Sequence, residues 1–392
     1  MPVAYEEDYP FPYNNFVYSV NVDKHESSTV PPSPQQPGTH PIPVDESTFI
    51  FRMPNPISGY NDKVRVENEV AALSLAREAL RPNLEHIVPR VYGWASAKGG
   101  NGWVLQERMP GDVLVEDFEA MDKADKAVIL GQMADILACL QRFELPGTIG
   151  KYGGLAFDAS GNIVSTALSI FHAGPFSSYH DLLRGTIQDK LEKVDADPWV
   201  RGWRDNGIRD RLDKFLSRGL TDLLKDISSL DKTLVHADFS TDNVLYDKST
   251  KKLTALVDFD FGHVGTVADE FFRSLGHGIG RFPDTRDGDP DMIQLHNVML
   301  YGFPDPLPEN GGDVDWVAAK AWDDALRERS LQRPATIPCM TTLADVFWLS
   351  SQILPWKLCN EVVVGNSTEE QLRERKSEGE TLLGNFLTYF GY

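Results

Sequence analysis

The amino-acid sequence predicts an α+β protein of two lobes: a small N-terminal lobe of antiparallel sheet with one helix, and a larger, mainly helical C-terminal lobe. The chain has 392 residues, which exceeds the size at which one hydrophobic core keeps growing. Short segments of alternating side chains precede residue 110, and longer amphipathic segments follow it. A "PG" pair at 110–111 breaks the chain between them. We therefore expect lobes at 1–110 and 111–392.

Four strands and one helix are expected in the first lobe. Alternating apolar and polar side chains indicate the strands, and an apolar stripe at helical spacing indicates a helix over 62–80. Residues 23–47 contain six prolines between Val30 and Val44, which predicts a flexible or extended connector, expected to be mobile. The expected strands span 16–22, 48–53, 90–96 and 103–109.

Longer periodic segments dominate the second lobe. Apolar residues recur at spacings of four, three, four and three from Ile129 to Phe143, which predicts an amphipathic helix over 122–143. A second helix is expected over 210–228. The segment 304–315 is rich in Pro, Gly, Asn and Asp, so we expect a loop there.

Composition and charge narrow the range of functions. A net charge of −20 argues against nucleic acid or an anionic membrane surface as a partner, and a solvated acidic surface accounts for it. The three cysteines, Cys139, Cys339 and Cys359, form no CxxC pair, which indicates a reducing compartment and no zinc site. Neither a signal peptide nor a run of eighteen apolar residues is recognised, so a cytoplasmic protein without a membrane span is expected.

The stretch 234–261, "LVHADFSTDNVLYDKSTKKLTALVDFDF", gathers Asp238, Asn243, Asp258 and Asp260. No Lys or Arg lies beside any of the four in the sequence. Such a set of oxygen ligands is electrostatically unfavourable until a hard divalent cation binds, and magnesium favours carboxylate, amide and phosphate oxygens. The stretch therefore predicts a magnesium site.

A β-hairpin is expected to assemble this site. With Val244 paired to Val257, Asn243 falls opposite Asp258 at the open end of the hairpin. Asp238 precedes the hairpin by five residues, in the loop that enters it. The expected result is a group of oxygen ligands around one point.

Phosphoryl transfer requires a set of this kind. In that chemistry metal ions bridge the nucleotide phosphates, and a separate aspartate accepts the proton of the attacking hydroxyl. Asp238 would be that base, with Asn243 and Asp258 holding metal. Asp260 either touches a second metal or orients the loop. An Asp, four residues, an Asn and then a distal Asp on a strand is the order of a kinase catalytic loop.

The stretch "HADFSTDN" followed by "LVDFDF" resembles the signature of the aminoglycoside phosphotransferase and choline kinase-like family, which are small-molecule kinases with a protein-kinase-like fold. Four further segments resemble that family in the same order: "YNNFVYSV" its phosphate-covering turn and second strand, "FIFRMP" its third strand, "VRVENEVAAL" its lobe-one helix, and "WVLQERMPG" the strand before its hinge. The resemblance spans roughly 11–275 and implies the same two-lobed fold.

The resemblance also implies roles for individual residues. His236 would support the catalytic loop, Asp238 would be the catalytic aspartate, and Asn243 and Asp258 would bind Mg²⁺. Asp269 would either receive hydrogen bonds from the catalytic loop or cap the helix at "DEFFRSL".

ATP is implied in the cleft between the lobes, with adenine facing the backbone of 106–109. Glu69, on the apolar stripe of its helix, would pair with the base of the third strand. That base is Arg52 where the family has lysine, and Arg can still fork onto phosphate. The turn "FPYNNF" lacks glycine, so a side-chain donor from Asn15 is expected instead. The implied ATP-binding residues are Asn15, Arg52, Glu69, Gln106, Glu107 and Met109.

The sequence thus predicts an ATP- and Mg²⁺-dependent phosphotransferase acting on a hydroxyl of a small metabolite, such as an amino alcohol, an aminoglycoside-like compound or a secondary metabolite. The alternatives are a nucleotide-binding pseudokinase and nucleotidyl transfer on the same fold. The acceptor and the oligomeric state stay open. Tryptophans in 170–206 and 280–360 are expected to serve packing, with an aromatic box for a quaternary amine as the alternative. They are Trp199, Trp203, Trp316, Trp322, Trp348 and Trp356.

Overall fold

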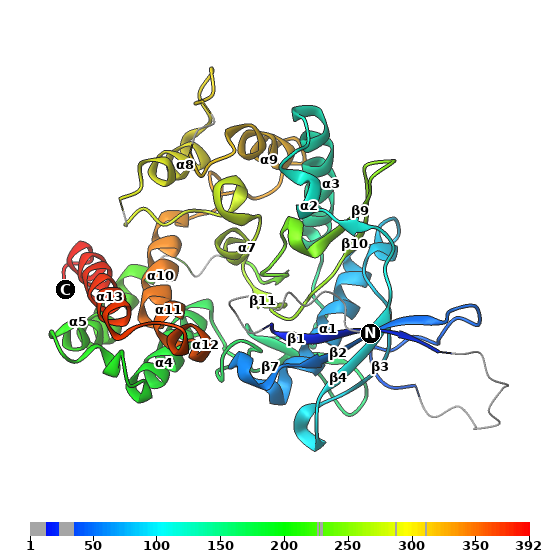
Figure 1. The fold of residues 1–392 in the computed structure, drawn as a ribbon, viewed down its shortest axis with the longest axis horizontal. Coiled ribbons are helices and arrows are strands. Elements are labelled where there is room, and N and C mark those ends of the chain that lie inside the picture. The colour runs from blue at the N-terminus through cyan, green and yellow to red at the C-terminus, as the bar shows by residue number, and fades with distance from the viewer. Residues whose placement is uncertain (1–12, 23–34, 226, 228–229, 287, 310–311) are drawn as a thin grey trace.

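The computed structural model describes residues 13–22, 35–225, 227, 230–286, 288–309 and 312–392. Figure 1 shows an antiparallel sheet with one helix on one side of the molecule and a larger group of helices on the other. The predicted α+β class with two lobes is confirmed. The lobe boundary at residue 110 stays a prediction.

The first lobe is built on a four-stranded antiparallel sheet in the order β1-β2-β4-β3. All four expected strands and the expected helix are present. Phe49 and Val104 are buried on this sheet, while alternate side chains stay partly exposed, as the period of a strand requires. The elements are β1 (Asn15–Asn21), β2 (Thr48–Pro54), α1 (Asp62–Ala79), β3 (Val91–Ala95) and β4 (Trp103–Glu107).

Helix α1 is buried on more than one side, because a hairpin from farther along the chain covers it. This hairpin consists of β6 (Gly154–Phe157) and β7 (Ile163–Thr166). Asn68 accepts the Leu155 N–H, and Glu67, which the pattern placed on the polar side of the helix, accepts the Phe157 N–H. The polar side of α1, which the sequence pattern predicts to be exposed, is therefore buried and hydrogen-bonded to this hairpin.

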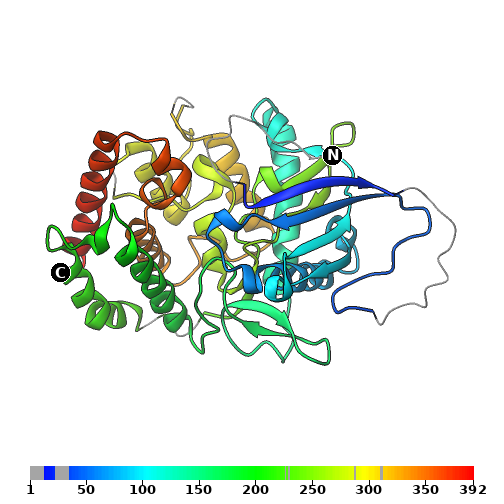
Figure 2. The ribbon, with the colours of Figure 1, turned by 60° about the horizontal axis from the view of Figure 1, so that its bottom comes forward.

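Within the described part of the connector, residues 35–47, residues 36–40 contact the edge strand β3, and Figure 2 shows the segment looping at the right-hand end of the sheet. Gln36 donates to the Trp94 carbonyl at 2.9 Å, the Trp94 indole donates to the Pro37 carbonyl at 2.9 Å, and the His40 N–H donates to the Val91 carbonyl at 2.8 Å. The expectation of a mobile connector is therefore wrong for this part, and residues 23–34 lie outside the described residues.

The second lobe is mainly helical, as predicted. The expected helix over 122–143 is α3, with Asp122 capping its first turn. The expected helix over 210–228 is shorter and starts earlier: α5 and α6 flank a π-helical turn over Phe215–Gly219. The helices are α2 (Val115–Phe118), α3 (Lys123–Arg142), α4 (Tyr179–Ala196), α5 (Ile208–Lys214), α6 (Leu220–Leu224), α7 (Val267–Arg273), α8 (Pro290–Tyr301), α9 (Trp316–Glu328), α10 (Met340–Ile353), α11 (Trp356–Cys359), α12 (Glu361–Gly365) and α13 (Glu369–Tyr389).

Short strands at the base of the second lobe position the motif. Strand β9 lies between β5 and β10, and β8 pairs with β11. A continuous hydrophobic core links these strands to α3 and α7. The strands are β5 (Asp112–Val113), β8 (Thr233–Val235), β9 (Val244–Asp247), β10 (Lys252–Leu256) and β11 (His263–Gly265).

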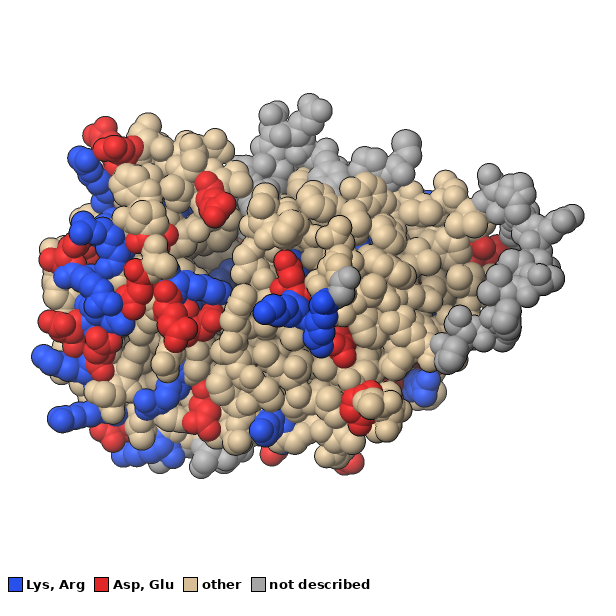
Figure 3. Space-filling view, turned by 90° about the horizontal axis from the view of Figure 1, so that it is seen from below, with Lys and Arg blue, Asp and Glu red and all other residues tan. Residues whose placement is uncertain are grey.

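The surface carries both signs of charge. On the face drawn in Figure 3, acidic and basic side chains are interspersed at the left-hand end, and much of the middle is uncharged. The described residues include no helix long and apolar enough to cross a membrane.

Candidate active site

The hairpin that carries the motif is formed by β9 and β10, and its register differs from the predicted one. Val244 pairs with Leu256, one residue away from its expected partner. The register shifts again between Leu253 and Ala255, where Thr254 is left as a bulge and turns its hydroxyl to a backbone carbonyl at 2.6 Å. A bulge of this kind leaves no signal in an alternating pattern, so the sequence did not reveal it.

The shift changes how the hairpin assembles the site. Asn243 lies against Val257, whose N–H donates to the Asn243 carbonyl at 2.9 Å, and not opposite Asp258. Asp258 instead adopts a left-handed backbone with φ of 63°. This conformation costs a non-glycine residue roughly 1–2 kcal/mol and ends the strand alternation. Asp258 is therefore placed by a turn rather than by the strand.

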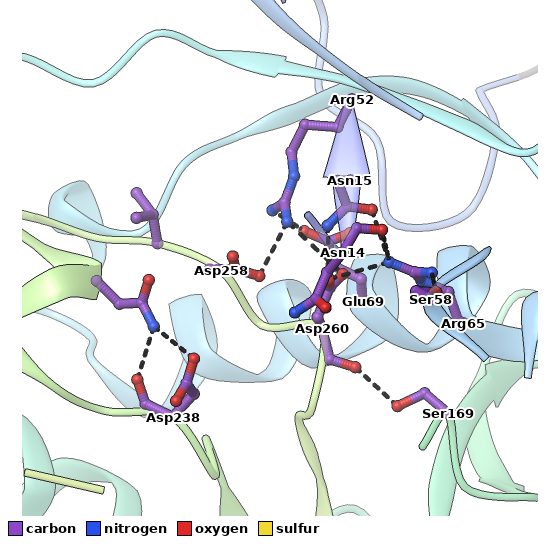
Figure 4. Close-up of polar contacts among 12 residues, drawn as sticks. Asn14, Asn15, Arg52, Ser58, Arg65, Glu69, Ser169, Asp238, Asp258 and Asp260 are labelled. Carbon is purple, nitrogen blue, oxygen red and sulfur yellow. Dashed lines mark hydrogen bonds and ion pairs between the residues drawn. The ribbon is translucent and has the colours of Figure 1, made fainter. Parts of the chain in front are cut away.

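Asp238 is held by Asn243. The Asn243 Nδ2 atom donates to the Asp238 Oδ2 at 2.9 Å and to the Asp238 carbonyl at 2.8 Å. Figure 4 shows Asp238 on the opposite side of the Asp258 backbone from the group around Arg52. With both N–H groups of its amide used on Asp238, Asn243 presents its amide oxygen as the remaining ligand atom.

A buried histidine forms hydrogen bonds with the loop that carries Asp238. His236 Nε2 lies 3.1 Å from the Val257 carbonyl, which can only accept, so Nε2 carries the proton and Nδ1 accepts the Asp238 N–H at 3.2 Å. Burial lowers the pKa of His236, which keeps it neutral. Ala237, with φ of 62°, and His236 both donate their N–H groups to Glu270, at 3.1 and 2.8 Å.

Glu270 accepts the hydrogen bonds of the loop that carries Asp238, a role that was one of the two predicted for its neighbour Asp269. Asp269 caps α7 through Thr266 and accepts the Tyr179 hydroxyl at 2.6 Å. Glu270 also accepts the Ser274 hydroxyl, and its pKa is raised by burial. The two acids are adjacent in the sequence, so only the direction of α7 decides which one faces the catalytic loop.

Arg52 from β2 lies among three carboxylates. Its Nη1 donates to Glu69 on α1, and its Nη2 donates to Asp258 at 2.9 Å and lies 3.6 Å from Asp260 (Figure 4). The sequence had no base beside Asp258 or Asp260, so the expectation of an uncompensated acidic pocket is wrong. Arg52 forms the expected contact with Glu69 and in addition bridges to the strand pair that carries the motif.

Arg65, which the sequence did not single out, is a second cation of the group. It is 2% exposed, and its Nη2 lies 3.2 Å from Asp260 and 2.9 Å from the Asn15 side-chain oxygen. Asn15 donates to the same Asp260 oxygen at 2.5 Å. Asn15 thus uses its side chain on Arg65 and Asp260, where a free donor for phosphate was expected.

The charges of this group do not balance. Three carboxylates, from Glu69, Asp258 and Asp260, face two guanidinium groups, from Arg52 and Arg65. Burial raises the pKa of Glu69 to about 8, against the opposing charge of Arg52. Burial acts in the same direction on Asp258, but the charge and hydrogen bond of Arg52 outweigh it and lower its pKa. With all three acids ionised the group would carry one negative charge in excess, and the raised pKa of Glu69 means that a proton takes up this charge at neutral pH. A bound cation would replace that proton.

The residues present fit a divalent ion. Oxygen atoms of Glu69, Asp258 and Asp260 lie within 4.8 Å of one another. The buried Oδ1 of Asp260 accepts no hydrogen bond from the described residues, although Arg52 Nη2 lies 3.6 Å from it. Adding the amide oxygen of Asn243 gives hard oxygen ligands of the type that magnesium prefers. Arg52 pairs with both Glu69 and Asp258, but Glu69 is the less suitable ligand, because burial raises its pKa to about 8 whereas the pKa of Asp258 is lowered.

The surroundings of Asp238 make its carboxylate more basic than that of an ordinary aspartate. Burial raises its pKa to about 6, and the charge of Asp258 raises it as well, while Arg273 and the Asn243 hydrogen bond act in the opposite direction. A carboxylate with this pKa is ionised at neutral pH and is a stronger base than an ordinary aspartate.

The segment that precedes the predicted hinge is ordered by its own contacts. Glu107 donates its N–H to the Arg90 carbonyl at 2.8 Å and accepts the Arg90 N–H on its side chain at 3.0 Å. Gln106 is buried, and its side-chain oxygen has no donor among the described residues. Met109 lies beyond the end of β4. Contact of these residues with adenine stays a prediction.

Known structures were compared with the chain. A ternary complex of a thermostable mutant of aminoglycoside phosphotransferase APH(4)-Ia with AMP-PNP and hygromycin B is 13% identical, with a TM-score of 0.48, over 98% of this chain and 93% of that one. A gentamicin complex of APH(2")-IIa is 13% identical, with a TM-score of 0.46, over 86% and 84%. A putative aminoglycoside phosphotransferase from Ralstonia eutropha JMP134 is 13% identical, with a TM-score of 0.45, over 88% and 86%. Likenesses of this size carry no argument about function.

A family model matches the chain, whereas curated proteins do not. None of the curated proteins compared with the chain matches it. The model of the phosphotransferase enzyme family matches residues 43–296, which is more than half of the chain and includes Arg52, Glu69, Asp238, Asn243 and Asp258. Together with the two-lobed architecture and the loop geometry, this match shows that the chain belongs to the phosphotransferase enzyme family.

Proposed function

We propose that this small-molecule kinase uses ATP and Mg²⁺ and transfers the γ-phosphoryl group to a hydroxyl of a small metabolite. The observation that carries the proposal is that Asp238, held by Asn243, lies close enough to Asp258 for their charges to interact, while Asp258 is paired with Arg52. Residues of both expected lobes form this group, and each of them lies within the stretch that the family model matches.

Asp238 supplies the base. The acceptor hydroxyl gives its proton to the Asp238 carboxylate as its oxygen attacks the γ-phosphorus, the new O–P bond forms, the bond to the β-phosphate oxygen breaks, and ADP leaves. Asn243 holds the carboxylate in one orientation, and the neutral His236 fixes the loop through the Asp238 N–H. Glu270 prevents the strained Ala237 backbone from relaxing.

Asn243 and Asp258 would hold the metal, with Asp260 beside them. When bound, Mg²⁺ supplies charge neutralisation for the phosphate oxygens. Arg52 keeps its charge at any physiological pH, and its two amino groups hold Glu69 and Asp258 together. This bridge fixes the first lobe over the motif.

Replacing Asp238 with Asn tests the proposal. Removal of a general base lowers the rate by about 10²- to 10⁴-fold, so Asp238→Asn is expected to lose this much kcat while it still binds Mg²⁺ and ATP. Asp242→Asn is the matched control: it makes the same change in the same loop, at an exposed position that accepts the Ser240 hydroxyl at 3.1 Å. The charge of Asp242 contributes less to the raised pKa of Asp238 than burial and the charge of Asp258 do, so the control is expected to change kcat little. ADP release is measured over a panel of hydroxylated acceptors.

The mass of the product separates the alternatives. Addition of a phosphate supports the proposal, and addition of a nucleotide indicates nucleotidyl transfer. Thermal stabilisation by Mg²⁺ and ATP that Asp238→Ala does not change, with no turnover of any acceptor, would indicate a binding protein. Wild-type turnover that survives in Asp238→Asn contradicts the assigned base.

A further inference from the structure

A small cavity of about 110 Å³ lies beside the catalytic loop, between α4, α7 and α10. Its walls are mostly apolar, but Lys190 from α4 and Arg273 from α7 both line it. One water takes roughly 30 Å³, so the cavity has room for a group of a few heavy atoms.

Neither of these cations forms an ion pair with an acid among the described residues, although Lys190 lies over the Phe171 ring at 5.5 Å and Arg273 over the Phe261 ring at 4.8 Å. Lys190 donates to the carbonyl and hydroxyl of Ser350, at 2.9 and 2.8 Å, and Arg273 Nε donates to the Ala237 carbonyl at 2.9 Å. Among the described residues, no carboxylate oxygen lies within 4.0 Å of either cation. Asp269, the acid of the cavity wall, is engaged by the cap of α7.

The small cavity adjoins a larger one of about 630 Å³, because Ile170 and Phe171 line both. The larger cavity has aromatic walls from Tyr60, Trp199 and Trp356. Tyr60 and Ile170 also pack on the residues around the catalytic loop. The two cavities are therefore neighbours, and Arg273 connects the smaller one, the cationic pocket, to the loop that carries Asp238 through its hydrogen bond to the Ala237 carbonyl.

The cationic pocket is electrostatically unsatisfied. Burial, with the charges of Arg273 and Lys193, lowers the pKa of Lys190 to about 7. Burial and Arg273 also lower the pKa of Arg281, which interacts with Asp238. The chain has a net charge of −20, so acidic residues are abundant, yet none of the described ones forms an ion pair with these groups. An anion between the two cations of the pocket would restore the pKa of the lysine and form charge-assisted hydrogen bonds with both.

We propose that the acceptor is a hydroxylated carboxylic acid with an apolar or aromatic body, whose carboxylate binds between Lys190 and Arg273 while its hydroxyl faces Asp238. This inference rests on the proposed function and names the acceptor class of the same site. The planar fork of Arg suits a carboxylate. An ammonium group is disfavoured in the smaller cavity, because it would meet Lys190 and Arg273 there. The larger cavity, with Asp197 and Glu361 in its wall, does not exclude one.

A matched pair of probes tests this acceptor class. The affinities of the full chain for 3-phenyllactate and for 3-phenyllactamide are measured by calorimetry. Two charge-assisted contacts correspond to a preference for the acid of about ten- to a hundredfold. Lys190→Met, which leaves the Arg273 contact in place, is expected to reduce this preference by about three- to tenfold and to leave the affinity for the amide unchanged. Lys376→Met, which removes a lysine that pairs with Asp205 on the same lobe, is expected to keep it.

The outcomes separate the two proposals. Equal affinity for acid and amide, absence of binding by the acid, or tighter binding of gentamicin than of the acid overturns the carboxylate pocket, whatever the kinase activity. A strong preference for the acid without ATP consumption on any acceptor keeps the pocket and rejects the kinase. Lys190→Gln, which retains a donor for Ser350, repeats the test if Lys190→Met does not fold.

Discussion

Charge is treated differently on the two sides of the catalytic loop. On the side where ATP is proposed to bind, Arg52 and Arg65 are both in contact with acids, and three acids face these two guanidinium groups. On the acceptor side, Lys190, Arg273 and Arg281 have no carboxylate partner among the described residues. This difference favours binding of a cation among the acids around Arg52, and binding of an anionic ligand beside Lys190 and Arg273.

The largest effect is expected from breaking the paired side. Arg52→Met leaves buried carboxylates on Glu69, Asp258 and Asp260 without this cation, and loss of one partner of a buried pair costs about 3–5 kcal/mol of unfolding free energy. Urea unfolding measures the loss. Arg281→Met on the unpaired side is the control and is expected to lose much less. Equal losses of unfolding free energy in both variants would contradict the stated difference between the two sides.

An intermediate effect is expected in the pH dependence of the rate. The pKa of Asp238 is about 6, so kcat/KM measured with a neutral acceptor is expected to be flat above this pH and to fall tenfold per unit below it. Arg273 lowers this pKa, so Arg273→Met is expected to move the acidic limb to higher pH. A limb near pH 4, or a shift to lower pH in the variant, contradicts the electrostatic assignment.

The smallest effect on stability at pH 7 is expected from removing a cation of the unpaired side. Lys190 has a pKa of about 7 in the folded state and an ordinary pKa in the unfolded state, so between these values the unfolded state holds more protons and stability rises with pH. Lys190→Met is expected to remove this rise and to change stability at pH 7 little or favourably.

The control for Lys190 lies one turn along the same helix. Lys193 pairs with the buried Asp189 at 3.1 Å, so Lys193→Met is expected to destabilise the protein by about 0.3–1 kcal/mol. Thermal unfolding between pH 6 and 10 compares the two variants. A greater loss in Lys190→Met than in Lys193→Met would mean that Lys190 is a structural cation, which contradicts the anion pocket.

Local pattern predicted the elements more reliably than their contacts. The strands β1 to β4 and helices α1 and α3 appear where periodicity placed them, because period and burial agree there. The hairpin register was wrong because the bulge at Thr254 changes the pairing without changing the pattern. Glu270, Arg65 and Arg273 were missed for a related reason: their importance comes from partners far away in the chain.

The sequence by itself determined the α+β class, the order of the elements and the spacing of Asp238, Asn243 and Asp258, because side-chain periodicity and short-range spacing are local properties. Only the tertiary structure decided how the charges are paired. Arg52 reaches Asp258 across 206 residues, and Lys190 is left without an acid although the chain has many. Coulomb energies depend on distances in space and on burial, and neither can be read from neighbours in the sequence.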